Sequence, residues 1–396
     1  MPVVTKKNEL IYPWIRNRIT PIYTFVFLLL FRIFPIKKNK IIIVSYFGKG
    51  FGDNGKYIVD ELLKNKKCKI IWACKNKFKD SVPNTIKTVK YYSPLYFYHL
   101  ATSKIWINNA RFVLGTIKRK HQFYIQVWHG DIGLKRIEAD AEQALPKSYV
   151  KGAKRDSKMA NIITSGSKYF TDYCRKYFWY DGEILESGCP RNDVFFKKKE
   201  LERINKKVRD CLHIAKDEKI LLYAPTFRKD YSLKYYDIDY KNTLECLKKK
   251  FGGKWKILVR LHPNVSAKSK QLKFWSEDVI DATGYQDSQE LLIACDAAIT
   301  DYSSIVFDYS LLKRPVFLFA PDYDLYNADR GFTLDYFNLP FTVSRSTKEL
   351  QKTIQNFSEK KYRDRLNDYL KNEVGSKEKG EASKIIANRI IEEMKK

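Results

Sequence analysis

The sequence predicts an α/β protein with two Rossmann-like, doubly wound domains that face a cleft, preceded by an N-terminal membrane-interface segment. Short apolar runs alternate with amphipathic stretches, which is the pattern of parallel strands covered by helices. This alternation occurs in two series, separated by a charged helical stretch near residues 198–215. The length of 396 residues also favours more than one domain, because one domain takes roughly 100–200 residues.

The first series predicts a domain over residues 40–195. Its opening run, KIIIVSY at 40–46, is apolar enough for a buried parallel strand, and a glycine-rich loop and a helix near 54–66 follow it. Helical patterns separate the later apolar runs. Further strands are expected at residues 68–74, 104–108, 123–128, 161–165 and 183–187.

The second series predicts a domain over residues 196–346, followed by charged C-terminal helices over residues 347–396. Its apolar runs again have the length of strands, and amphipathic stretches lie between them. Strands are expected at residues 220–224, 255–261, 296–300 and 315–320, and helices near residues 240–250, 288–295 and 304–313.

Residues 1–39 predict a segment that lies on a membrane surface. The apolar run at 22–34 would reach only about 20 Å as a helix, against a hydrocarbon core of about 30 Å, so a membrane-spanning helix is not expected. Eight of the first 40 residues are basic and only Glu9 is acidic, which favours an anionic lipid surface. The alternative is a buried first helix with a solvated basic edge.

The chain has 74 basic and 45 acidic residues, a net charge of +29. Such a charge attracts an anionic partner: nucleic acid, anionic lipid or a phosphorylated substrate. The sequence has no RNA-binding aromatic motif or zinc knuckle, so nucleic acid is not expected as a partner. Its seven cysteines form no Cys-x-x-Cys pair, so neither a disulfide framework nor a zinc site is expected.

Polar residues that follow the predicted strands are the candidates for a functional site, because doubly wound sheets bind ligands at the carboxyl ends of their strands. In the first domain, His129 and Asp131 follow the strand at 123–128. A histidine there can accept a proton near pH 7, although a lone histidine is more often structural.

In the second domain, two strand ends carry cationic groups. Thr226 and Arg228 follow the strand at 220–224 and can hold a phosphate, unless they form only a surface turn. Arg260 and His262 point to the same side of an extended strand, an arrangement that suits an anionic substrate.

A further strand end carries hydroxyl groups. Ser303 and Ser304 precede a predicted helix, whose free N–H groups attract anions, and Asp308 one turn later can accept hydrogen bonds from a ribose or polyol. Asp301 and Ser303 are alternatively only helix caps. Because basic and hydroxyl groups dominate the clusters, the expected ligand is a nucleotide diphosphate, and these groups can stabilise its charge without a metal ion.

Five motifs spread over most of residues 41–330. They are WHG (128–130) with LK (134–135), SGCPRND (187–193), YAPTFR (223–228), RLHPN (260–264) and TDYSSIVFDY (300–309). In this order they resemble the CDP-glycerol glycerophosphotransferase family of teichoic acid and capsule synthesis. The resemblance implies a GT-B-like fold for the two domains.

The resemblance also implies an activity. A polyol phosphate, glycerol phosphate foremost, would pass from CDP-glycerol or CDP-ribitol to a hydroxyl group, and CMP would be released without any cofactor. The acceptor would be an undecaprenyl-diphosphate-linked saccharide or a growing polymer. The enzyme would be peripheral at the cytoplasmic face of the cell membrane, on its anionic surface. A nucleotide-sugar glycosyltransferase of the same fold, which releases UDP or GDP, is the alternative.

Site roles follow from the same resemblance. His129 would be the base, and His262 the second essential imidazole. Asp308 would face the polyol or ribose of the donor. The donor phosphates would be held by Thr226, Arg228, Arg260, Ser303 and Ser304. Either a structural role or a place in the cleft is expected for Asp131, Arg191, Asn192, Asp193 and Asp301.

Overall fold

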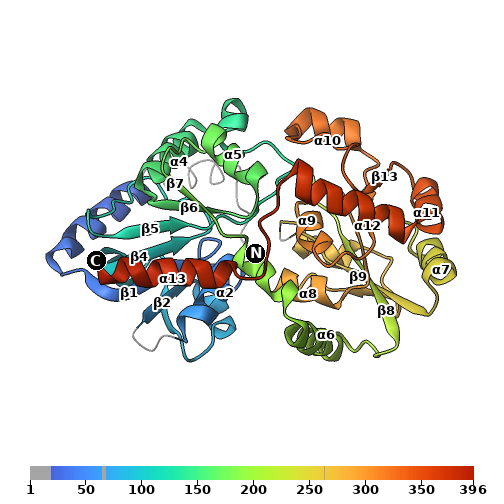
Figure 1. Ribbon diagram of the computed structural model, residues 1–396, viewed down its shortest axis with the longest axis horizontal. Coiled ribbons are helices and arrows are strands. Elements are labelled where there is room, and N and C mark those ends of the chain that lie inside the picture. The colour runs from blue at the N-terminus through green and yellow to red at the C-terminus, as the bar shows by residue number, and fades with distance from the viewer. Residues whose placement is uncertain (1–18, 65–67, 263) are drawn as a thin grey trace, which may run out of the picture.

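Two parallel β-sheets, one in each half of the chain, form the framework of the protein (Figure 1). The computed structural model describes residues 19–64, 68–262 and 264–396. The strand order is β3-β2-β1-β4-β5-β6-β7 in the first sheet and β10-β9-β8-β11-β12-β13 in the second. Each sheet extends in one direction from its first strand and then in the other, so the expected pair of doubly wound α/β domains is confirmed.

The central strand of the first sheet, β1 (Lys37–Val44), is apolar because helices cover both of its faces. Ile41 and Ile43 pack with α2 and α13, whereas Ile42 and Val44 pack with α3. The other strands are β2 (Lys69–Cys74), β3 (Lys87–Lys90), β4 (Ser103–Asn108), β5 (Phe123–Gln126), β6 (Ile162–Ser165) and β7 (Glu183–Glu186). The helices are α2 (Asp53–Leu62), α3 (Pro94–Thr102), α4 (Lys147–Met159) and α5 (Lys168–Tyr177).

The second sheet is covered in the same way. Its strands are β8 (Glu218–Ala224), β9 (Lys254–Val259), β10 (Val279–Asp281), β11 (Ala297–Thr300), β12 (Val316–Phe319) and β13 (Thr342–Ser344). The helices that follow the first domain in the sequence are α6 (Lys198–Leu212), α7 (Tyr240–Phe251), α8 (Ser288–Ala294), α9 (Ile305–Ser310), α10 (Tyr323–Arg330), α11 (Thr347–Gln355), α12 (Glu359–Asp368) and α13 (Ala382–Lys395).

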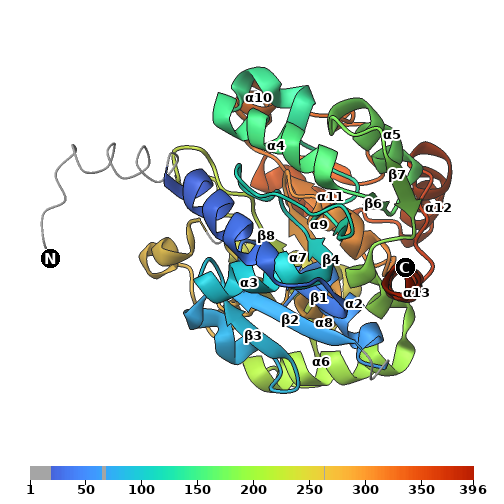
Figure 2. The same cartoon turned by 90° about the vertical axis from the view of Figure 1, so that its left-hand side faces the viewer.

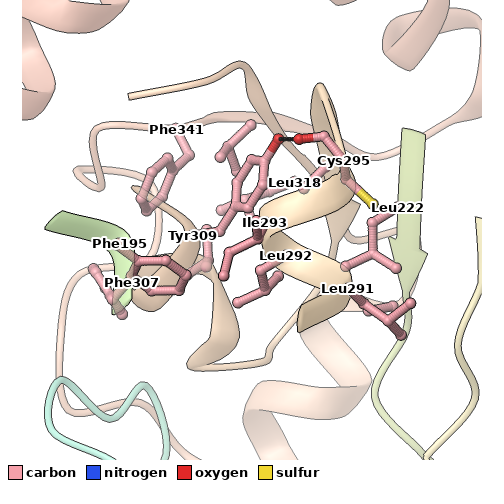
Figure 3. Packing of buried hydrophobic residues seen from close by; sticks show 14 of the residues in the cluster. Phe195, Leu222, Leu291, Leu292, Ile293, Cys295, Phe307, Tyr309, Leu318 and Phe341 are labelled. Carbon is pink, nitrogen blue, oxygen red and sulfur yellow. Dashed lines mark hydrogen bonds between the residues drawn. The ribbon is translucent and has the colours of Figure 1, made fainter. Parts of the chain in front are cut away.

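A dense apolar core holds α8 and α9 against this second sheet (Figure 3). Leu222 of β8 and Leu318 of β12 pack with side chains of both helices. The Tyr309 hydroxyl of α9 donates a hydrogen bond to the Cys295 carbonyl at 3.0 Å. Phe195, from the segment that joins the two domains, belongs to the same core. The loops before α8 and α9 therefore rest on a rigid base.

Three strands are absent from the sequence-based expectation: β3, β10 and β13. Each has only three or four residues and forms an edge of its sheet. An edge strand pairs on one side only and needs no continuous apolar run, so the pattern that reveals central strands does not reveal it.

The C-terminal residues 347–396 are helical as expected, but they divide between the domains. Helices α11 and α12 pack on the second domain, whereas α13 crosses back and packs along α2 and β1 of the first (Figure 1). The Asp193 carboxylate accepts hydrogen bonds from the backbone N–H groups of Ala382 (2.9 Å) and Ser383 (2.7 Å). Asp193 thus caps α13, a structural role that stabilises the start of a helix.

The apolar run at 22–34 forms a helix over residues 19–30 that continues into a short 3₁₀ helix, Phe31–Ile33, at the edge of the first domain (Figure 2). Tyr23 and Phe27 pack against Phe97 of α3. The opposite face is exposed, with Ile19, Ile22, Phe25, Val26, Leu29, Leu30, Ile33 and Phe34. Within the described residues, none of the helices combines the length and apolar character needed to cross a bilayer. Residues 1–18, which include half of the basic residues expected to lie on a membrane, are outside the described residues.

Candidate active site

The cleft between the two domains contains two adjoining cavities. One, of about 410 Å³, is lined by Lys135, Tyr169 and Thr226, and we call it the Lys135 cavity. The other, of about 610 Å³, is lined by Phe47, Tyr285 and Asp308, and we call it the Tyr285 cavity. The residues that line both are His129, Arg260, His262, Ser303, Ser304 and Ile305. Five sequence-predicted site residues therefore lie at one junction, although one comes from the first domain and four from the second.

His129 follows β5 and faces the cleft. Trp128 before it has a φ of 38°, in the left-handed region, and this turn directs His129 away from the strand. The Nδ1 atom lies 2.7 Å from the Asn109 carbonyl oxygen. Because a carbonyl can only accept, this contact assigns the proton to Nδ1 and leaves a lone pair on Nε2. Desolvation of the ring inside the cleft lowers the pKa of His129, so the imidazole is neutral near pH 7 and can accept a proton.

His262 follows β9 and has the opposite proton arrangement. Its Nδ1 accepts a hydrogen bond from the backbone N–H of Asn264 at 3.1 Å. The neutral ring therefore carries its hydrogen on Nε2, which can donate. Burial, with Lys135, Lys49 and Arg260 nearby, lowers the pKa of His262 to about 4. The junction thus combines one imidazole that accepts with one that donates.

Arg260 is the cation at the junction. Within the described part of the chain, no carboxylate oxygen lies within 4.0 Å of its guanidinium. One of its nitrogens donates to the Tyr285 carbonyl, and burial lowers its pKa. Ser303 and Ser304 line the same place, and Gly130 lies opposite Ser304. These groups can hold the oxygens of a phosphate.

Arg228 is placed differently from the expected phosphate ligand. Its guanidinium forms a two-point ion pair with Asp322, at 2.6 and 3.0 Å, and a bond of 2.9 Å to Asp301. It is 7% exposed and lines neither cavity. Asp301 also accepts from the backbone N–H groups of Thr226 and Tyr302. We therefore assign Arg228 and Asp301 to holding the ends of β8 and β11 together.

Arg191 and Asp308 form an ion pair between the two domains. Arg191 pairs with Asp308 at 2.9 Å and with Asp53 of the first domain at 2.9 Å. It also donates to the His129 carbonyl at 2.8 Å, which positions that residue. Asp308 lines the Tyr285 cavity, and Arg191 holds its carboxylate.

The remaining predicted residues form a buried polar cluster. Asn192 donates to Asp308 at 3.3 Å and to Glu378 at 2.9 Å. Asp131 accepts from the Gly166 N–H at 2.7 Å and lines the Lys135 cavity. Burial raises the pKa of Asp131 to about 6 and that of Glu378 to about 8. Asp131 and Arg191 also line the cavities, so the expectation of either a structural role or a place in the cleft stays a prediction for these residues.

Several cavity residues have no counterpart among the predicted site residues. Lys135, Tyr169 and Tyr173 line the Lys135 cavity, and Tyr285 and Gln289 line the Tyr285 cavity. Tyr285 follows β10, an edge strand that the sequence analysis did not predict, so no pattern in the sequence placed Tyr285 at a strand end. Lys135 belongs to the LK motif that supported the family resemblance, and this motif could have identified it as a site residue. No group of His, Cys, Asp and Glu residues suited to a metal ion occurs among the residues that the structure describes.

Comparison with known proteins finds relatives that match most of this chain. A teichoic acid poly(glycerol phosphate) polymerase of Staphylococcus epidermidis is 35% identical over 82% of this chain, which spans about half (47%) of that relative. A polymerase of the same name from Bacillus spizizenii is 30% identical over 95% of this chain and 98% of the relative. Ribitol-phosphate polymerases occur among the weaker matches.

Structure and family comparisons give the same result. A structure of the wall teichoic acid polymerase TagF matches with a TM-score of 0.82 at 30% identity, over 96% of this chain and 97% of that one. The sequence profile of one family matches residues 25–392. The resemblance predicted from the five motifs is confirmed, and the chain belongs to the CDP-glycerol:poly(glycerophosphate) glycerophosphotransferase family.

Proposed function

We propose that the protein transfers glycerol phosphate from CDP-glycerol to a hydroxyl of a lipid-linked saccharide or growing teichoic acid polymer and releases CMP. The observation that carries the proposal is the meeting of two cavities at one pair of imidazoles with opposite proton arrangements. The relatives with the highest identity above carry glycerol phosphate in their names. CDP-ribitol is the alternative donor.

Phosphoryl transfer places the attacking and leaving oxygens roughly in line, on opposite sides of the phosphorus. The two cavities on either side of the junction suit this requirement. The Tyr285 cavity holds the nucleoside, because aromatic side chains and the Asp308 carboxylate line it. Arg260, Ser303 and Ser304 hold the diphosphate at the junction, and the acceptor enters from the Lys135 cavity.

In this arrangement His129 is the base. Its Nε2 takes the proton of the acceptor hydroxyl as the acceptor oxygen bonds to the β-phosphorus of the donor. The bond between that phosphorus and the CMP oxygen breaks at the same time. His262 donates a hydrogen bond from Nε2 to the departing phosphate, and Arg260 stabilises its charge.

Product analysis tests the reaction. The enzyme is incubated with CDP-glycerol, CDP-ribitol or a nucleotide sugar, together with a lipid-linked saccharide, and the products are identified by mass. We expect CMP and an acceptor that has gained glycerol phosphate. Release of UDP or GDP from a nucleotide sugar, without CMP from either CDP-polyol, would replace this proposal with a glycosyltransferase.

His129→Ala tests the base. Single-turnover CMP release should fall about 10²–10⁴-fold, because a general base contributes that much, while donor affinity changes far less. His262→Ala is the matched variant and should weaken donor binding as well as turnover. If His129→Ala keeps near-normal turnover and His262→Ala abolishes it without weakening donor binding, the two roles are exchanged.

We further propose that the protein is peripheral at the cytoplasmic face of the cell membrane, where it meets an undecaprenyl-diphosphate-linked acceptor. The exposed apolar face of the helix over 19–30 supports this location, since Arg32, Lys37 and Lys38 lie exposed beside it.

The triple change Phe25→Ser, Leu29→Ser and Ile33→Ser should release the protein from anionic vesicles and keep donor binding. Leu325→Ser, at an exposed leucine of α10, is the control. Full sedimentation of the triple variant would contradict the location.

A further inference from the structure

Four basic side chains lie close together where the strands of the first sheet begin. We call them the Lys40 cluster, and they are Lys37, Lys40, Lys87 and His99. Lys37 and Lys40 belong to β1, Lys87 begins β3, and His99 lies in the last turn of α3. The strands concerned are parallel, so they begin at one edge of the sheet, opposite the edge that forms the cleft. None of the four residues lines either cavity of the cleft.

Lys40 is the buried base of the cluster, with 4% of its surface exposed. Its Nζ donates to the Thr102 hydroxyl at 2.6 Å and lies 4.8 Å from the centre of the Tyr98 ring. Within the described residues, no carboxylate oxygen lies within 4.0 Å of Lys37, Lys40 or Lys87. Burial, together with Lys37 and Lys87, lowers the pKa of Lys40 to about 8, so the ammonium is mostly charged at pH 7. A buried cation among like charges is costly, and an anion that joins it is therefore favoured.

His99 gives a second, independent sign at the same place. The side chain is 5% exposed, and neither of its ring nitrogens has a hydrogen-bond partner among the described residues. A neutral imidazole has one donor and one acceptor nitrogen, and buried groups of this kind usually have partners. Burial and the three lysines lower the pKa of His99 to about 4, so the ring is neutral near pH 7. An unused donor beside three uncompensated cations indicates an anionic ligand.

The end of α3 does not account for the lysines. The C-terminus of a helix attracts cations through its free carbonyl groups, but here other side chains occupy these groups. The Thr102 hydroxyl donates to the Tyr98 carbonyl at 2.6 Å, and the Ser103 hydroxyl donates to the His99 carbonyl at 2.7 Å. The Gln122 amide donates to the next two carbonyls at 2.8 and 3.3 Å. The helix end therefore leaves the charge of the cluster uncompensated.

We propose that the Lys40 cluster binds a phosphate group, with Lys40 and His99 at the base of the site and the exposed Lys37 and Lys87 at its rim. Phosphate oxygens accept several hydrogen bonds at once, and ammonium groups bind them as point charges. The inference goes beyond the proposed function, because the cluster lies away from the cleft and takes no part in the transfer.

Two sources carry such a group: a free phosphate ion and the headgroup of an anionic lipid. Phe31 and Phe34, at the end of the exposed apolar segment, pack against the Tyr98 ring. Lys40 lies over the same ring. A phosphate held by the cluster is thus beside the segment that we propose to meet the membrane, and the experiment presents each source alone.

Calorimetric titration with inorganic phosphate, at an ionic strength held constant with chloride, tests the first source. Lys40→Met should weaken binding about 10–150-fold, the range of a charge-assisted hydrogen bond, and His99→Phe should weaken it roughly 2–10-fold. Lys90→Gln, at an exposed lysine at the other end of β3, is the matched control and should leave the affinity unchanged. Arg260→Gln weakens phosphate binding in the cleft and should leave the cluster intact.

The melting temperature is a second readout, because the cluster without an anion destabilises the fold. In the absence of phosphate, Lys40→Met should melt at a higher temperature than the wild type. Added phosphate should raise the melting temperature of the wild type more than that of Lys40→Met, since a ligand stabilises the state that binds it. Lys87→Gln, at the exposed rim, repeats the binding test without a change in the core.

Sedimentation with phosphatidylglycerol vesicles tests the second source. If free phosphate does not bind, but Lys40→Met weakens vesicle binding and Lys90→Gln does not, the phosphate belongs to a lipid headgroup. Phosphate affinity and vesicle binding that both stay unchanged in Lys40→Met and Lys87→Gln would overturn the site. Phosphate binding that disappears only in Arg260→Gln would also overturn it. CMP release should stay normal in the cluster variants, so failure of this site leaves the proposed function intact.

Discussion

The ends of β8 and β9 look alike in the sequence and differ in the structure. Each carries an arginine soon after its strand, Arg228 or Arg260, and each arginine fits a phosphate ligand. Arg228 is paired with Asp301 and Asp322 and lies outside both cavities. Arg260 lies at the junction of the cavities and has no carboxylate within 4.0 Å in the described residues. The carboxylate partners of an arginine in this cleft, and not the motif that contains it, therefore distinguish a structural role from a ligand-binding one.

The physical reason is the free energy of moving a charge out of water. Carboxylates already present in the fold offset this free energy for Arg228, whereas the half-buried Arg260 has only the Tyr285 carbonyl and would be stabilised by an anionic ligand. Lys135 resembles Arg260, because no carboxylate oxygen of the described residues lies within 4.0 Å of its Nζ, and Arg191 resembles Arg228. Three measurements test this division.

Arg228→Met should have the largest effect, on stability. Two buried carboxylates would lose their partner, which typically costs about 3–5 kcal/mol of folding free energy. Thermal and denaturant unfolding measure this loss. The double variant Arg228→Met, Asp322→Asn should recover part of it. A stable Arg228→Met protein with reduced CDP-glycerol affinity would show that Arg228 binds the donor and would break the comparison.

Arg260→Gln should have an intermediate effect, on donor binding. Loss of a charge-assisted phosphate contact costs about 1.5–3 kcal/mol, so CDP-glycerol should bind roughly 10–150-fold more weakly in calorimetric titration. The melting temperature should change little, since no ion pair is lost. Arg345→Gln, at an exposed arginine of the same domain, is the control. A large drop in melting temperature with normal donor affinity would contradict the assignment.

The pH dependence of acceptor binding should show the smallest effect. With a pKa of about 8, Lys135 is mostly charged at pH 7 and mostly neutral at pH 9. KM for a growing polymer, which carries phosphates, should therefore rise up to about tenfold as pH rises through this range, because the charge that attracts those phosphates is lost. A bound phosphate raises the pKa of Lys135 and moves the rise to higher pH. Lys135→Arg should give a flat profile, and an unchanged rise in that variant would assign the titration to another group.

Much of the fold could be predicted because central strands are buried on both faces. The run at 40–46 is apolar on successive residues, since Ile41 and Ile42 enter cores on opposite sides of the sheet. The edge strands β3, β10 and β13 and the return of α13 to the first domain had no such signal. The return depends on contacts between distant parts of the chain, such as the capping of α13 by Asp193, 189 residues before Ala382.

The sequence by itself determined which chemical groups lie at the strand ends. Local apolar patterning shows where each strand ends, and the residues that follow can be read directly. His129, Arg260, His262, Ser303 and Ser304 were all placed in this way. Only the tertiary structure decided which of these groups are free to act. Asp322 is 94 residues from Arg228, and the Asn109 carbonyl that sets the proton of His129 is 20 residues away. Pairing and proton placement are properties of neighbours in space, and local sequence patterning does not contain them.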